Sequence, residues 1–174
     1  MKKRTNYLSW TDYFISIARL VAQRSKDPST QVGTVVINPY DNTLISTGYN
    51  GFPRGCSDDE FPWGNGKAEE SSLKVPAEFS NSVWLNTKYP YVVHAEANAL
   101  IRARQNCVGF VLYTTLFPCN ECAKLIIQAG IKKVYYLNIV EKETWKESFQ
   151  ATQRMFKSAE VVSQKVDYKS ENKR

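Results

Sequence analysis

Apolar residues recur along the chain with helical and strand periods, which predict where the elements lie. Over residues 9–25 they stand three or four positions apart, so we predict a helix with Ser9 as its N-cap. Residues 31–37 and 43–49 are predicted to be two strands, and the turn-forming sequence NPYDN between them indicates an antiparallel hairpin. The apolar positions that share the predicted helical face are Trp10, Tyr13, Phe14, Ile17, Leu20 and Val21.

The second half of the chain alternates helical and strand patterns. A strand, a helix and a second strand in succession predict a right-handed parallel crossover, and Gly130 is suited to end the helix of that unit. The sum is an α/β layer fold whose mixed sheet has about five strands, with helices on both faces. The predicted elements are helices over 94–105, 119–130 and 143–159, strands over 109–115 and 132–138, and an edge strand over 160–166.

The middle of the chain, at about 51–90, differs in composition from the rest. Glycine, proline, serine and charged residues dominate GFPRGCSDDEFPWGNGKAEESS, and this length predicts a loop-rich insertion rather than an ordinary loop. We expect only weak helical pieces over 72–85, and we expect Trp63 and Trp84 to pack the insertion rather than to cover a pocket. At 174 residues, the chain is most simply one domain, residues 1–174.

Composition and charge narrow the class of protein. Hydrophobic residues at 43% and charged residues at 23% are typical of a globular protein. The basic start MKKR has no apolar stretch behind it, and no run is long enough to cross a bilayer, so we expect an intracellular, cytoplasmic protein. The net charge of +6 favours anionic partners such as nucleotides, although much of the excess lies at the two ends, where basic tails are usually solvated.

Cysteine and histidine give the strongest chemical signal. The motif HAE at 94–96 and the motif PCNEC at 118–122 open two successive predicted helices that flank one strand, so the two segments can meet. Cys119 and Cys122 project from one helical face, and together with His94 they offer three zinc ligands. Three protein ligands leave a tetrahedral zinc ion one open position for water, which is typical of a catalytic site. Glu96 is then free to move protons.

The histidine and the cysteines also allow structural and redox interpretations. A lone histidine is more often structural, and C-x-x-C by itself can be a redox pair. A structural zinc site would require Cys56 or Cys107 as the fourth ligand, but both are most simply ordinary thiols. The joint occurrence of H-x-E and P-C-x-x-C, in this order, favours the catalytic zinc site because this combination is the signature of zinc deaminases.

With these motifs, the sequence resembles the deoxycytidylate (dCMP) deaminases of the cytidine deaminase superfamily over nearly its whole length. Beyond HAEANAL and FPCNECAKLIIQAGIKKV, the blocks AQRSKDPSTQVG, GYNGFPRGCSDD and KYPYVVHAE resemble that family. The resemblance implies a cytidine-deaminase-like three-layer α/β/α fold and Zn²⁺ held by the residues that match His94, Cys119 and Cys122. It also implies hydrolysis of dCMP to dUMP and ammonia, which feeds thymidylate synthesis. Glu96 matches the catalytic glutamate, which carries protons from water to cytosine N3 and to the departing amino group.

The resemblance implies further contacts to nucleotides. Asn50 matches the family asparagine that contacts the sugar, with a turn residue before glycine as the alternative, and the backbone of Ala95 is expected to face the cytosine edge. Arg24 and Lys26 also suit a helix end without any ligand. In many members dCTP activates and dTTP inhibits, with Mg²⁺ on the triphosphate, and hexamers are common, so we expect these effectors and a homo-oligomer here. The positions expected near the substrate phosphate or an effector are Arg24, Lys26, Gly51 and Arg54.

Alternative functions stay open on the sequence alone. The same motifs are compatible with deamination of dCTP or of a C5-modified cytosine nucleotide. A polynucleotide deaminase acting on tRNA or single-stranded DNA would use the same zinc chemistry, but no aromatic-interleaved basic stripe for strand binding is evident. A noncatalytic zinc-stabilised binding module is the alternative from another class, and the unliganded Glu96 disfavours it. No membrane partner is expected.

Overall fold

Five strands form one mixed sheet in the computed structural model, which describes residues 1–65 and 81–168. Strand β1 pairs antiparallel with β2 and with β3, while β3 pairs parallel with β4 and β4 with β5. The sheet order is β2-β1-β3-β4-β5, so the hairpin, the parallel crossover and the C-terminal edge strand are all confirmed. The strands are β1 (Gly33–Asn38), β2 (Thr43–Tyr49), β3 (Val111–Leu116), β4 (Lys133–Asn138) and β5 (Val162–Lys165).

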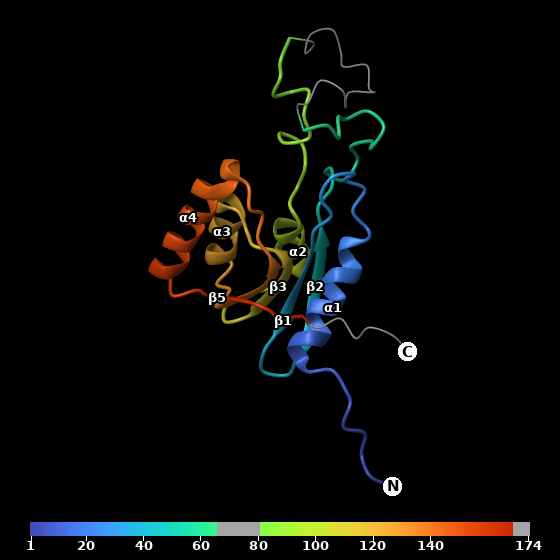
Figure 1. The fold of residues 1–174 in the computed structure, drawn as a ribbon, viewed down its shortest axis with the longest axis vertical. Helices are drawn as coiled ribbons and strands as arrows, with labels where there is room; N and C mark the ends of the chain where they lie inside the picture. The colour runs from blue at the N-terminus through green and yellow to red at the C-terminus, as the bar shows by residue number, and fades with distance from the viewer. Residues whose placement is uncertain (66–80, 169–174) are drawn as a thin grey trace.

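Four helices cover the two faces of this sheet. Helix α1 packs against β1 and β3 on one face, and α2, α3 and α4 lie over the other, so the expected three-layer arrangement is confirmed (Figure 1). The crossover helix α3 follows β3 and leads into β4, and α4 packs beside it. The helices are α1 (Trp10–Ala22), α2 (Ala95–Ala103), α3 (Asn120–Gln128) and α4 (Glu143–Ser158).

The core divides into two clusters because successive strand residues point to opposite faces of the sheet. On β1, Val35 and Ile37 pack toward α1, whereas Val36 between them packs toward α2 and α3. Both faces of β1 are therefore buried, and its sequence TVVI lacks polar alternation. Full burial of each such side chain stabilises the fold by about 1.5–3 kcal/mol. The largest buried residues on the α2 and α3 side include Leu112, Ile126, Ile131, Val134 and Phe156.

Helix α1 buries only part of the predicted face: Phe14 is buried, and Ile17 and Val21 pack against the core. Ser9 is the N-cap as expected, with its side chain accepting the Asp12 amide, but Trp10 and Leu20 are 58% and 66% exposed. A Cβ on Gly33 would lie 2.0 Å from the carbonyl oxygen of Ala18, so β1 approaches α1 closely along the small residues of the helix. This leaves Trp10, Tyr13 and Leu20 on the exposed side of the helix. The buried residues of α1 are Phe14, Ile15, Ala18 and Ala22.

A second close approach fixes α2 against β2. A Cβ on Gly48 would lie 2.2 Å from the carbonyl oxygen of Ala95 and 2.3 Å from the amide of Ala99. The first turn of α2 therefore sits directly on the end of β2. Helix α2 ends at Ala103, two residues before the predicted end, because Arg104 adopts a left-handed conformation with φ 51°.

Aromatic contacts pack the described part of the loop-rich segment against itself. Trp63 stacks on Phe52 with ring centroids 4.1 Å apart, and Phe61 meets Tyr91 edge-on at 5.0 Å. The expected packing role of Trp63 is confirmed, while Trp84 is 58% exposed. Most of the stretch 72–85, where weak helical pieces were expected, lies outside the described residues, and 81–85 form turns. No helix in the described ranges has the length and apolar character to cross a membrane.

Candidate active site

Three predicted metal ligands converge at one edge of the sheet. His94 is the N-cap of α2, Cys119 is the N-cap of α3, and Cys122 lies in the first turn of α3. The Nδ1 atom of His94 lies 3.4 Å from the Cys119 sulfur and 3.3 Å from the Cys122 sulfur. The three ligand atoms all lie within 4.8 Å of one another. His94 and Cys119 thus stand just before their helices rather than inside them, because both have extended backbones.

The geometry and chemistry of this trio fit a zinc ion. Zinc bonds of about 2.3 Å to sulfur and about 2.0 Å to nitrogen, at tetrahedral angles, place sulfur and nitrogen about 3.5 Å apart. Two thiols and one imidazole are also the donors that zinc prefers over the hard cations. Within the described ranges, this trio is the one group of His, Cys, Asp and Glu side chains whose ligand atoms converge in this way.

Protonation of the two thiols differs strongly. Hydrogen bonding with Cys122 lowers the pKa of the Cys119 thiol to about 4, against the effect of burial and with support from His94. The same hydrogen bond and burial raise the pKa of Cys122 well above the usual value. One thiolate is therefore ready at neutral pH, and metal binding would release the proton of the second.

Glu96 lies beside the metal ligands and is almost completely enclosed. It occupies the first turn of α2, is 4% exposed, and its Oε2 accepts a hydrogen bond from the Cys122 thiol at 3.4 Å. Burial raises the pKa of its carboxyl, an effect that the neighbouring His94 partly opposes. A carboxyl whose pKa is raised toward neutrality can both accept and return a proton, which is the requirement for general acid-base catalysis.

His94, Cys119 and Glu96 line a cavity of about 200 Å³. The residues lining it come from six separate parts of the chain, and they form one apolar and one polar wall. On the apolar wall, Phe117 follows β3, and Trp145 and Phe149 project from α4. Lys142, the exposed N-cap of α4, also lines the cavity.

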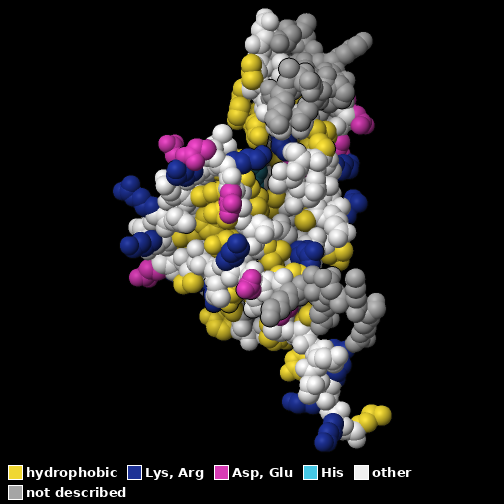
Figure 2. Space-filling view, viewed as in Figure 1, with side chains coloured by type: hydrophobic (Ala, Val, Ile, Leu, Met, Phe, Trp, Pro, Cys, Tyr) yellow, Lys and Arg dark blue, Asp and Glu magenta, His cyan; other side chains and the backbone are white. Residues whose placement is uncertain are grey.

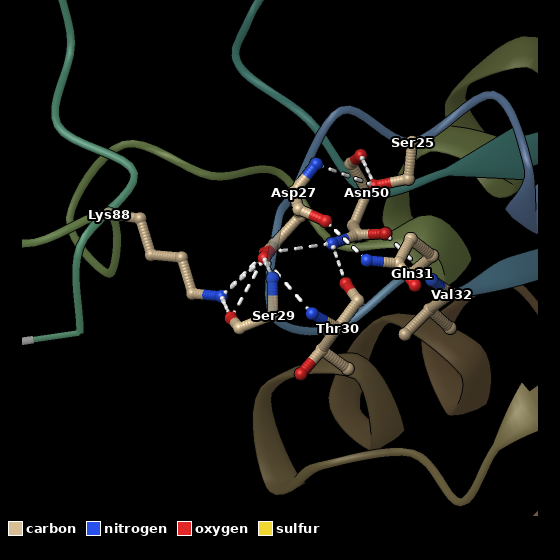
Figure 3. A network of polar contacts seen from close by, with 8 residues as sticks. All are labelled: Ser25, Asp27, Ser29, Thr30, Gln31, Val32, Asn50 and Lys88. Atoms are coloured by element: carbon tan, nitrogen blue, oxygen red, sulfur yellow. Dashed lines mark hydrogen bonds and ion pairs between the residues drawn. The ribbon is translucent and has the colours of Figure 1, made fainter. Parts of the chain in front are cut away.

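The polar wall is a buried hydrogen-bond network built around Asp27 (Figure 3). Lys88 donates to both carboxylate oxygens of Asp27, at 2.7 and 2.6 Å, and to the Ser29 hydroxyl at 2.6 Å. The backbone amides of Ser29 and Thr30 also donate to Asp27. Burial acts to raise the pKa of the Asp27 carboxyl, but the Lys88 and backbone hydrogen bonds outweigh it and leave that pKa below the usual value.

Asn50 lies within this network, and its side chain joins β2 to the loop after α1. Its Oδ1 accepts the Val32 amide at 2.8 Å, and its Nδ2 donates to the Thr30 carbonyl at 2.9 Å and to Asp27 at 3.3 Å (Figure 3). Asn50 also lines the cavity. The side chain therefore shapes the polar wall, and its contact with a sugar stays a prediction.

The structure separates the other predicted nucleotide contacts from the cavity. Arg24, Lys26 and Arg54 are exposed, none of them lines the cavity, and Lys26 is ion-paired with Asp58. Gly51 forms an isolated bridge with Val93, the residue before His94. Ala95 is fully buried against Gly48 and does not line the cavity, so its expected contact with the cytosine edge stays a prediction.

Cys56 and Cys107 play no part in the metal site. All four cysteines are free thiols, and neither of these two belongs to the group that could hold a metal. The structure therefore favours a three-ligand site over a closed four-ligand one and gives no support for a disulfide between Cys119 and Cys122.

Sequence reasoning missed the residues that form the cavity walls. Lys88 and Asp27 lie in the segments KYPYVVHAE and AQRSKDPSTQVG, but no periodicity indicates that they pair across 61 positions. Trp145 and Phe149 were assigned only to a helix, four positions apart on one face. That spacing was the one available signal for a wall on α4.

Comparisons with known proteins agree with this site. Residues 8–138 match the family model described as the cytidine and deoxycytidylate deaminase zinc-binding region. A deoxycytidylate deaminase of Mus musculus is 47% identical over 165 residues, covering 94% of this chain and 83% of the relative. A probable deoxycytidylate deaminase of Drosophila melanogaster is 49% identical over 160 residues, covering 91% and 73%.

A solved structure extends the agreement to the fold. The dCMP deaminase from the cyanophage S-TIM5, in complex with dCMP and dUMP, is similar with a TM-score of 0.61 and 27% sequence identity. The similarity covers 89% of this chain and 95% of that one.

Proposed function

Because the chain belongs to the family of cytidine and deoxycytidylate deaminases, we propose that it hydrolyses dCMP to dUMP and ammonia. One observation carries this proposal. A buried carboxyl, Glu96, lies next to the zinc-binding His94, Cys119 and Cys122 at a cavity that is large enough to admit a pyrimidine ring. Such a carboxyl has no use in a purely structural zinc site.

The reaction requires water to add at C4 of cytosine and the exocyclic amino group to leave. When bound at the trio, zinc would supply the Lewis-acid activation that makes water a nucleophile at neutral pH. Glu96 takes a proton from that water and delivers it to N3, and it then takes the proton of the hydroxyl now attached to C4 and passes it to the amino nitrogen. The C4–N bond then breaks, ammonia departs, and the carbonyl of uracil forms.

The walls of the cavity suggest how a nucleotide is held. The base would lie between the apolar side chains of α4 and the metal site, with the ribose toward Asn50 and the polar wall. Lys88 is neutralised by Asp27, whereas Lys142 forms no ion pair within the described ranges. We therefore assign the substrate phosphate to Lys142 at the rim, where the N-terminus of α4 adds its positive end.

A mononucleotide fits the surface better than a polynucleotide does. On the face shown in Figure 2, Lys and Arg side chains are scattered among acidic and apolar ones and form no continuous stripe. Strand binding requires a basic groove with aromatic platforms. The solved relative holds the mononucleotides dCMP and dUMP, which supports the same substrate class here.

Regulation and assembly form a second part of the proposal. Arg24, Lys26 and Arg54 are exposed outside the cavity, which suits an effector triphosphate, dCTP as activator or dTTP as inhibitor, with Mg²⁺, better than the substrate. Ile101 on α2 and Leu125 on α3 are 70% and 46% exposed, which supports a homo-oligomer, and we propose a hexamer. We place the enzyme in the cytoplasm, where its four free thiols would persist.

The test is ammonia release from the zinc-loaded protein. The substrates are dCMP, dCTP, 5-methyl-dCMP, deoxycytidine and a cytosine-containing oligonucleotide, each with and without dCTP or dTTP as effector. We expect rapid turnover of dCMP that responds to both effectors. Turnover confined to the oligonucleotide would overturn the substrate, and zinc binding without any deamination would favour a binding module.

A further inference from the structure

The zinc ligand Cys119 lies at a helix end that has no cap of its own. An N-cap side chain ordinarily accepts a hydrogen bond from an amide in the first turn of its helix. The Cys119 side chain makes no such bond in α3 and is directed at His94 instead. Because the Cys119 side chain is used for metal binding, other groups must hold Cys119 in place and accept the backbone amides of the first turn of α3.

Two hydroxyl groups on α4 form hydrogen bonds with the backbone on either side of Cys119. The amide of Asn120 donates to the Ser148 hydroxyl at 3.1 Å, and that hydroxyl donates to the Asn120 side-chain oxygen at 2.7 Å. One turn further along α4, the hydroxyl of Thr152 donates to the Pro118 carbonyl at 3.1 Å. Thr152 is 0% exposed, so this bond has no competition from water.

The two bonds bracket Cys119. The Pro118 carbonyl belongs to the peptide bond that precedes Cys119, and the Asn120 amide belongs to the one that follows it. Both peptide bonds of this ligand are therefore held by α4, whereas Cys122 is held by its own helix. Since Ser148 and Thr152 are four positions apart, a rigid helical turn sets the distance between the two bonds.

We propose that Ser148 and Thr152 are positioning residues that fix Cys119 in its metal-binding geometry and thereby set the zinc affinity. Groups that orient a ligand typically contribute 10–100-fold to metal affinity. The geometry of the Cys119 thiolate relative to Cys122 depends on α4, so the loss of either hydroxyl widens the range of positions that this sulfur samples. The inference rests on the zinc site of the proposed function but not on its substrate.

The test measures zinc affinity by chelator competition in Ser148→Ala, Thr152→Val and the double variant. We expect binding about tenfold weaker in each single variant and up to about 100-fold weaker in the double variant. The absorption bands of the cobalt(II)-substituted proteins should shift, because they report the thiolate geometry. Thr152→Ser keeps the hydroxyl and should restore both zinc affinity and spectrum, which a general loss of stability would not explain.

Two controls separate positioning from destabilisation. Ser46→Ala removes a buried hydroxyl that donates to the Ala99 carbonyl at 2.7 Å, away from the ligands, and Ser158→Ala removes an exposed hydroxyl on α4. Both should keep wild-type zinc affinity. The inference would be overturned if Ser148→Ala and Thr152→Val kept the zinc affinity and cobalt spectra of the wild type. It would also be overturned if Ser46→Ala lost as much zinc affinity as they do. Failure of the wild type itself to bind zinc would instead refute the metal site of the proposed function.

Discussion

Replacement of Lys88 by methionine tests the polar wall most directly. Lys88 and Asp27 are 7% and 3% exposed, and the ammonium group contacts both carboxylate oxygens at 2.6–2.7 Å. Methionine preserves most of the buried side-chain volume but leaves the carboxylate without its cation. Loss of one partner from a buried pair costs about 3–5 kcal/mol, so we expect Lys88→Met to lower the free energy of unfolding by that amount at neutral pH.

The loss of stability in Lys88→Met should depend on pH in a direction that follows from the pKa of Asp27. In the wild type the pKa of Asp27 is lowered, so its contribution to stability is present above the unfolded-state pKa and is lost as pH falls through the folded-state pKa. In Lys88→Met the hydrogen bonds from the backbone, Ser29 and Asn50 remain, but the cation that opposes the effect of burial is gone, so the carboxyl takes up a proton at higher pH. The deficit of the variant should therefore shrink as the pH falls from about 7.5 to about 5.5.

Urea unfolding of the zinc-loaded proteins measures both effects. Asp27→Asn combined with Lys88→Met removes the uncompensated charge and should recover a large part of the lost stability. Lys146→Met is the matched control, since it breaks an exposed pair with Glu143 and should change the free energy of unfolding by less than about 1 kcal/mol. A cost for Lys88→Met no larger than that of Lys146→Met, or a deficit that grows as pH falls, would refute the reasoning.

Three further predictions address the metal site, the rim of the cavity and the packing beneath it. Glu96→Gln should bind zinc normally but lose at least about 100-fold in kcat, because the amide cannot carry a proton; near-normal ammonia release would contradict its role. Lys142→Ala should raise KM for dCMP at least about tenfold and leave turnover of deoxycytidine unchanged, and equal effects on both would remove Lys142 from the phosphate. Gly48→Ala should lower the free energy of unfolding, measured in urea, by about 1–3 kcal/mol and should weaken zinc binding, because its Cβ would meet the backbone of Ala95. Wild-type stability of this variant would contradict the packing.

The metal site could be predicted from the sequence because its signals are local. Cys119 and Cys122 are three positions apart, and Glu96 follows His94 by two. Each of these two motifs therefore lies at the N-terminus of a single helix, which sets the relative positions of its residues. The two helices flank one strand, β3, and this arrangement brings the two motifs together. The β1–β2 hairpin and the β3–β4 crossover also followed from local patterns, whereas the antiparallel pairing of β3 with β1 is long-range and was not predicted.

The cavity walls could not be predicted because their contacts are long-range. Asp27 and Lys88 meet across the whole loop-rich segment, and a charged residue in a loop ordinarily indicates solvent exposure. The buried face of α1 was only partly predicted for a related reason. Periodicity favours the larger apolar residues, whereas the close approach of Gly33 selects Ala18 and its small neighbours.

The backbone amide of Lys88 has a consequence for protein engineering. It donates to the Gly64 carbonyl at 2.9 Å, so the chain between these residues begins and ends at one point beside the cavity. The free energy of closing a chain segment grows only logarithmically, by about 0.6 kcal/mol for each doubling of its length. This junction is therefore a natural place to insert a fluorescent or affinity module that reports on ligand binding while the catalytic groups stay in register.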